Sequence, residues 1–192
     1  MNNAFNHESY LVRKKILTLA GAKFHIYDPT GNLVFFSKMK AFKLKEDIRL
    51  FTDENMQTEL LSIQARNILD IAATYDVMDP ESGEKVGALR RKGLKSMLKD
   101  EWIFMDANDN EIGLIKEDSI FLALVRRFLT NLIPQTYLGD ISGQQVCKFK
   151  QNFNPFVTKI AIDFSSDKNT LLDRRLGIAA AVLLCAIEGK QS

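Results

Sequence analysis

The sequence predicts a mainly β protein, a closed antiparallel β-barrel of about twelve strands around a central hydrophobic C-terminal α-helix. Two observations predict this fold. A hairpin pattern recurs five times along the chain, and a stretch near the C-terminus is apolar on every face that a helix would have. With 192 residues, 46% of them hydrophobic, the chain is long enough to form one domain with a large core.

Each repeat of the hairpin pattern has a run of β-forming residues, an aspartate among small or polar residues, and a second run. Successive turn aspartates are separated by 25, 26, 27 and 34 residues. In such a cluster an aspartate accepts a hydrogen bond from the backbone two residues on, and glycine adopts a positive φ angle. Apolar runs on both sides of the turn predict a β-hairpin. The turn aspartates are Asp28, Asp53, Asp79, Asp106 and Asp140.

Two further strands, over residues 11–19 and 157–164, complete the expected barrel. Residues 1–9 are polar and predict a flexible N-terminal arm before a single barrel domain over 10–189. Within 37–45 the apolar face changes parity between Ala41 and Phe42. A β-bulge there would keep the apolar side chains inside. The same bulge would direct four lysines outward, namely Lys38, Lys40, Lys43 and Lys45.

One amphipathic segment interrupts the hairpins and accounts for the gap of 34 residues. Residues 119–133 place apolar side chains on one helical face and polar ones, including Arg126 and Arg127, on the other. This pattern predicts an amphipathic helix that ends at Pro134. Its apolar face has two interpretations, a cover for one end of the barrel or a membrane contact.

Residues 176–187 contain no charged and no strongly polar side chain. A helix that is apolar all round is either buried or spans a membrane. These 12 residues would measure about 18 Å as a helix, against roughly 30 Å of bilayer hydrocarbon. We therefore predict a buried helix that fills the barrel, because side chains alone cannot fill so wide an interior. Thr170 and Asp173 have the spacing of a capping box at its start.

The chain resembles the LURP-one-related proteins, which belong with the tubby C-terminal domain and the phospholipid scramblases. The ending Asp-Arg-Arg-Leu-Gly-Ile-Ala-Ala-Ala-Val-Leu-Leu over 173–184 carries the resemblance, together with hairpins such as Tyr-Asp-Pro-Thr-Gly-Asn over 27–32. The resemblance covers about 10–189 and implies the barrel around a helix. Tubby domains bind phosphoinositide head groups through basic residues, and scramblases move lipids. Many LURP-one-related proteins have no established activity.

Two features of scramblases are missing here. Their EF-hand-like calcium site corresponds to 163–170, where a calcium loop needs a glycine at its sixth position and a carboxylate at its twelfth. Lys168 and Arg174 occupy those positions, so we expect a polar strand-to-helix turn and no metal. The cysteine-rich stretch that is palmitoylated in many scramblases is also missing, which argues against stable membrane anchoring.

The sequence indicates neither an enzyme nor a cofactor. His7 and His25 stand outside any nucleophile signature, and His25 fits a satisfied or solvent-facing strand histidine. Phosphate-loop, dinucleotide and zinc-protease motifs are lacking, and the repeated aspartates fit turns better than paired catalytic carboxylates. Cys147 and Cys185 lie in apolar surroundings, where reduced, packed thiols and a cytoplasmic location are expected.

Clusters of basic residues are the best indication of a binding site. Clustered lysine and arginine attract phosphate or anionic lipid, although outward lysines on a barrel also serve only to solvate it. The candidates are Lys38, Lys40, Lys43 and Lys45, then Arg90, Arg91, Lys92, Lys95 and Lys99, with Arg126 and Arg127 on the amphipathic segment.

The expected partner is an anionic phospholipid or membrane surface, contacted peripherally. A net charge of +2 is too small to indicate nucleic acid. Three alternatives stay open, namely scramblase-like lipid transfer, a structural or interaction domain without a small ligand, and, least favoured, an unrecognised hydrolase. The sequence does not indicate an oligomeric state.

Overall fold

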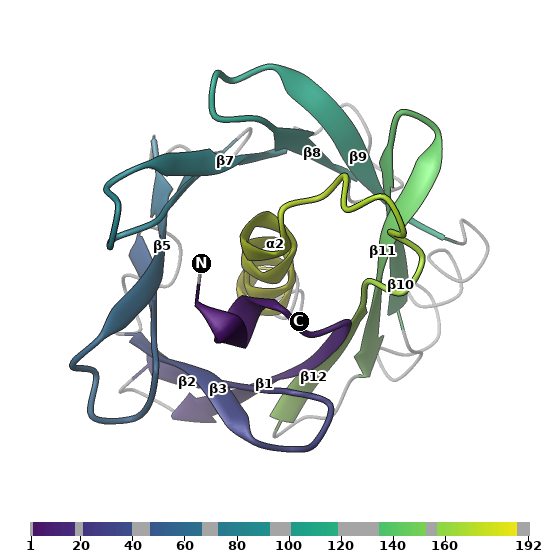
Figure 1. The fold of residues 1–192 in the computed structure, drawn as a ribbon. Coiled ribbons are helices and arrows are strands. Elements are labelled where there is room, and N and C mark those ends of the chain that lie inside the picture. The colour runs from purple at the N-terminus through teal and green to yellow at the C-terminus, as the bar shows by residue number, and fades with distance from the viewer. Residues whose placement is uncertain are drawn as a thin grey trace.

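The computed structural model describes residues 2–17, 21–39, 47–66, 73–92, 101–118, 135–152 and 157–187. Within them, twelve antiparallel strands form one sheet that closes into a barrel, with the helix α2 at its centre (Figure 1). Each strand pairs with its neighbours in sequence, and β1 closes the barrel against β12. The predicted fold class is confirmed.

The strands match the five hairpins and the two extra strands predicted above. Their bounds are β1 Ser9–Leu17, β2 Gly21–Tyr27, β3 Leu33–Met39, β4 Asp47–Phe51, β5 Glu59–Ala65, β6 Thr74–Met78, β7 Lys85–Arg91, β8 Glu101–Met105, β9 Glu111–Glu117, β10 Gln135–Ile141, β11 Gln144–Asn152 and β12 Val157–Asp163.

The turn aspartates hold the hairpin turns, as their positions predicted. Asp28 Oδ1 accepts hydrogen bonds from the N–H groups of Thr30 and Asn32, both at 2.9 Å. Asp106 does the same for Asn108 and Asn110, at 2.8 and 2.9 Å. The same kind of bond is made by Asp53, Asp79, Asp140 and, after β12, Asp163. These carboxylates therefore shape turns rather than a catalytic pair.

We expect the Asp28 turn to contribute stability that disappears in acid. Burial opposes the shift, but hydrogen bonds from Thr30 and Asn32 lower the pKa of Asp28 from 3.8 to about 2. A carboxylate with a lowered folded-state pKa contributes its full stability above the unfolded pKa and loses it as pH falls through the folded one. The loss should therefore run from about pH 4 to about pH 2. Urea unfolding across pH 2–7 measures it.

Asp28→Asn is the matched variant, because it keeps a side-chain acceptor but cannot titrate. The stability difference between wild type and Asp28→Asn should be constant near neutral pH and shrink below pH 4. A difference that stays constant down to pH 2 would contradict the assignment.

Helix α2, Arg174–Ile187, lies inside the barrel as predicted, with every residue from Leu176 to Ala186 buried. Its N-cap differs from the prediction. Asp173, not Thr170, caps the helix, because the Asp173 carboxylate accepts a hydrogen bond from the Arg175 N–H at 2.9 Å. Thr170 has a φ of 49°, a turn conformation outside any capping box. At Gly177 a Cβ would lie 2.5 Å from the Phe164 ring, so this glycine permits close packing.

The N-terminal residues pack on the barrel, although their polar composition suggested a loose arm. A short 3-10 helix, η1 Asn3–Phe5, precedes β1, and Phe5 is 3% exposed. The Phe5 and Phe35 ring centroids are 4.8 Å apart. The Tyr10 hydroxyl donates to the Ala4 carbonyl at 2.9 Å. One buried phenylalanine thus anchors this segment.

Different charged groups meet the two ends of α2. The hairpin turns, with their aspartates, lie at the end where α2 begins, since Arg175 Nη1 contacts Asp79 Oδ2 at 2.8 Å in the β6–β7 turn. At the other end, the inward side chain of Lys14 donates from Nζ to the Cys185 carbonyl at 2.9 Å and to the Ala186 carbonyl at 3.4 Å. A buried lysine therefore meets the last turn of α2, an arrangement the sequence did not predict.

Two predictions fall outside the described residues. They are the amphipathic helix over 119–133 and the bulge between Ala41 and Phe42. Among the helices that the structure describes, none has the length and apolar character needed to cross a bilayer.

Candidate anion-binding face

Five adjacent strands, β11, β12, β1, β2 and β3, carry outward charges of almost one sign. Within their bounds the one acidic residue is Asp163, at the end of β12. We call the outward cations of these strands the basic face. It consists of Arg13, Lys15, Lys23, Lys38, Lys148, Lys150 and Lys159.

The strand register makes the basic face continuous. Arg13 on β1 lies opposite Lys159 on β12. On the other side Lys15 lies opposite Lys23 on β2, which in turn lies opposite Lys38 on β3. Neighbouring strands are about 4.8 Å apart, so residues in register lie side by side. The cations are thus gathered by strand pairing, although they come from both ends of the chain.

Most of these cations are exposed and lack an acidic partner. Lys23 Nζ contacts Glu54 Oε2 at 3.4 Å. Arg13 has a weaker contact, since its guanidinium carbon lies 5.8 Å from the centre of the Tyr27 ring. Among the described residues, six exposed cations of the face form no close ion pair, namely Arg13, Lys15, Lys38, Lys148, Lys150 and Lys159. Lys148 nevertheless lies opposite Asp163 in register, and after the hydrogen bonds from Ser165 its charge helps to lower the pKa of that carboxyl.

His25 lies within the basic face and is satisfied, which is one of the two possibilities predicted for this strand histidine. Its Nε2 is 3.1 Å from Glu54 Oε1, and its side chain is 19% exposed. The hydrogen bond with His25, helped by Lys23, lowers the pKa of Glu54. Glu54 is therefore held as an anion at the edge of the face, with its charge committed to these two partners.

The charges on β4–β9 contrast with the basic face, because most of the described cations there are paired with acids; Lys116 on β9 is exposed and stands in register with Glu101. Arg49 bridges Asp47 and Glu59. In the second predicted cluster, Arg90 pairs with Glu111, and Lys92 Nζ lies 3.1 Å from Glu101. Arg91 is half-buried. The two predicted clusters thus differ, because Lys38 joins the unpaired face whereas Arg90 and Lys92 are neutralised by carboxylates.

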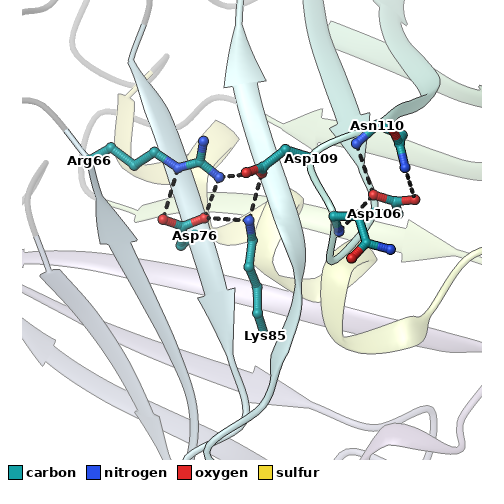
Figure 2. Close-up of polar contacts among 7 residues, drawn as sticks. Arg66, Asp76, Lys85, Asp106, Asp109 and Asn110 are labelled. Atoms are coloured by element: carbon teal, nitrogen blue, oxygen red, sulfur yellow. Dashed lines mark hydrogen bonds and ion pairs between the residues drawn. The ribbon is translucent and has the colours of Figure 1, made fainter.

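Among the described residues, the largest paired group joins the end of β5, β6, β7 and the β8–β9 turn. Figure 2 shows Arg66 and Lys85 pointing at Asp76 and Asp109 from different strands. Arg66 bonds Asp76 twice, at 2.6 and 2.9 Å, and also pairs with Asp109. Lys85 Nζ lies 2.6 Å from Asp109 and 3.3 Å from Asp76. Two cations meet two carboxylates, so this group fastens strands together and offers no surplus charge to an anion.

The other predicted basic residues lie outside the described part of the chain. They are Lys40, Lys43, Lys45, Lys95, Lys99, Arg126 and Arg127. Sequence reasoning missed six members of the basic face, namely Arg13, Lys15, Lys23, Lys148, Lys150 and Lys159. Their alternation with apolar residues was a usable signal, but only barrel closure brings β1, β12 and β11 together.

Among the described residues, Cys147, Cys185 and Asp167 are buried, and Asp167 is hydrogen-bonded within the protein. Burial raises the pKa of the Cys147 thiol, and it raises that of Cys185 to about 12, so neither is a thiolate nucleophile. In the region compared with a calcium loop, the Asp167 carboxylate accepts hydrogen bonds from the Leu171 N–H and from Arg174, both at 2.9 Å. The residues that the structure describes include no group of three potential metal ligands.

Comparison with known proteins agrees with this architecture. The family model described as LURP-one-related matches residues 8–91 and 34–178. The chain belongs to the LURP-one-related family. Its barrel is consistent with the tubby-like superfamily.

A solved structure shares the fold of this LURP-one-related chain. It is the X-ray structure of a protein from Arabidopsis thaliana, with 13% identity and a TM-score of 0.51, covering 95% of this chain and 93% of the other. At that identity the likeness concerns the fold alone. A comparison with functionally curated proteins found no match.

Proposed function

We propose that this LURP-one-related barrel is a non-enzymatic binding domain whose basic face takes anionic lipid head groups or another phosphate-bearing partner. One observation supports the proposal above all others. Six exposed cations that form no close ion pair among the described residues gather on four of the five adjacent strands, namely β11, β12, β1 and β3, while the described cations of β4, β7 and the end of β5 contact carboxylates or are half-buried.

The pairing pattern matters because a paired cation has little attraction left for a ligand. An unpaired lysine or arginine near an anionic membrane contributes about 1 kcal/mol to binding. Lysines that served only solubility would be interspersed with acids, as on β4–β9. A face of one sign instead fits a partner of the opposite sign.

The test compares two triple variants that lose the same charge. Lys15→Gln, Lys150→Gln and Lys159→Gln together remove three cations of the basic face. Arg49→Gln, Arg90→Gln and Lys92→Gln together remove three paired cations elsewhere. Binding is measured by sedimentation with vesicles of phosphatidylcholine alone or with phosphatidylserine, and by calorimetry with inositol hexakisphosphate.

Wild type should bind the phosphatidylserine vesicles and not pure phosphatidylcholine. The basic-face variant should lose binding by at least tenfold, since each cation near the membrane is worth about 1 kcal/mol, and the control variant should retain it. Binding of inositol hexakisphosphate without vesicle binding would identify a soluble phosphate-bearing partner. Failure of wild type to bind any of these probes, or equal losses in both variants, would refute the proposal.

A further inference from the structure

We infer that the barrel lies on its side on an anionic bilayer with β1 nearest the surface, and that it recognises charge density rather than the shape of one head group. This inference rests on the proposed function and specifies its partner. It follows from where the basic face lies on a closed, convex barrel.

The order of the strands makes β1 the centre of the basic face. The strands follow one another as β11, β12, β1, β2 and β3. In a barrel of twelve strands each step turns the surface by about 30°, and the backbone radius is about 12 Å. Consider a flat membrane surface that touches the side-chain ends of β1. The side-chain ends on β12 and β2 then lie about 2 Å from this surface, and those on β11 and β3 lie about 8 Å from it.

Those distances grade the contribution of each strand. The Debye length is about 8 Å at physiological salt, so charges one strand from the contact act at nearly full strength and charges two strands away are strongly screened. Arg13 and Lys15 on β1 should therefore contribute most. Lys148 and Lys150 on β11, although also exposed, should contribute least, because they lie farther from the contact and because Lys148 stands opposite Asp163.

The chemistry of the face favours a charged plane over a specific head group. Five of its six unpaired cations are lysines, which act as hydrated point charges, whereas planar two-point recognition of phosphate is the property of arginine. The cations spread over five strands in two dimensions. A bilayer presents its charges in two dimensions, whereas a nucleic acid presents them along a line.

The distribution of acidic and apolar groups sets the tilt and depth of docking. The carboxylates that border the basic face, Asp28 after β2 and Asp163 at the end of β12, lie at the barrel end where α2 begins. Lys23, near the start of β2, and Lys38, near the end of β3, lie toward the other end of the barrel. That opposite end should therefore tilt toward the membrane. Among the described residues, the one exposed large hydrophobic side chain is Leu171, which is outside the basic face, so docking should be superficial and reversible by salt.

Two double variants of equal charge test the orientation. Arg13→Gln with Lys15→Gln alters β1, and Lys148→Gln with Lys150→Gln alters β11. On vesicles containing phosphatidylserine at physiological salt, the β1 variant should bind about 30-fold more weakly than wild type and the β11 variant about threefold. Circular dichroism melts confirm that both are folded. Equal losses, or a larger loss for the β11 variant, would overturn the orientation.

Vesicles of equal surface charge test the recognition mode. One set carries phosphatidylserine and the other phosphatidylinositol 4,5-bisphosphate, and duplex DNA is added as a competitor. We expect equal affinities for both sets, release by 0.5 M salt and weak competition by DNA. Much tighter binding to the phosphoinositide, or to DNA, overturns this inference but leaves an anion-binding face intact. Binding to none of these probes overturns this inference, and it refutes the proposed function as well when inositol hexakisphosphate is not bound either.

Discussion

Ala180→Asp should leave the chain unfolded, because it places a carboxylate at the centre of the barrel. Ala180 is 2% exposed, and its neighbours Ala179 and Ala181 are fully buried. An unpaired charge in such surroundings costs several kcal/mol or more. Domains are stable by only about 5–15 kcal/mol, so one such group removes most of the margin. Near-ultraviolet circular dichroism and urea unfolding measure the outcome.

Ala161→Asp provides the control for this prediction. It is the same substitution at an exposed, outward position of β12, where a carboxylate stays hydrated, and stability should change by less than about 0.5 kcal/mol. A soluble Ala180→Asp protein with a cooperative unfolding transition close to wild type would show that α2 is not enclosed by the sheet.

The fold was largely predictable because its signals are local in the sequence. Each turn aspartate bonds to backbone two to four residues on, so the hairpins can be identified from short segments. The all-apolar stretch in α2 likewise indicates burial without knowledge of its surroundings. The cap was predicted wrongly at Thr170, because both Thr170 and Asp173 are capping types and only backbone geometry distinguishes them.

The basic face was only partly predictable because it depends on contacts between distant residues. Arg13 and Lys159 are neighbours through the pairing that closes the barrel. Arg90 looked like part of a basic cluster in sequence, yet Glu111 lies beside it in the structure. The sequence gives the number of cations. The net charge around each cation depends on the residues of the neighbouring strands, which the sequence alone does not show.

The adjacent residues Lys14 and Lys15 also show that the role of a cation depends on its place in the structure. The two are adjacent and chemically identical, but strand alternation directs them to opposite faces. Lys15 is exposed on the basic face, whereas Lys14 is 1% exposed and reaches the end of α2. The carbonyls of a last helical turn lack partners within the helix and carry the negative end of its dipole. The buried Lys14 ammonium donates hydrogen bonds to these carbonyls and places a positive charge at the negative end of the dipole.

Lys14→Glu should therefore destabilise the protein severely, by about 4 kcal/mol or more, because it buries a negative charge against carbonyl oxygens at the negative end of a helix. Lys15→Glu reverses the same charge one residue away and should cost less than about 0.5 kcal/mol, although it should weaken binding to anionic vesicles. Urea unfolding of the two variants measures the contrast. The two variants have the same net charge and differ only in which face of β1 carries the new carboxylate. Equal stabilities would therefore mean that the Lys14 ammonium does not hold the end of α2.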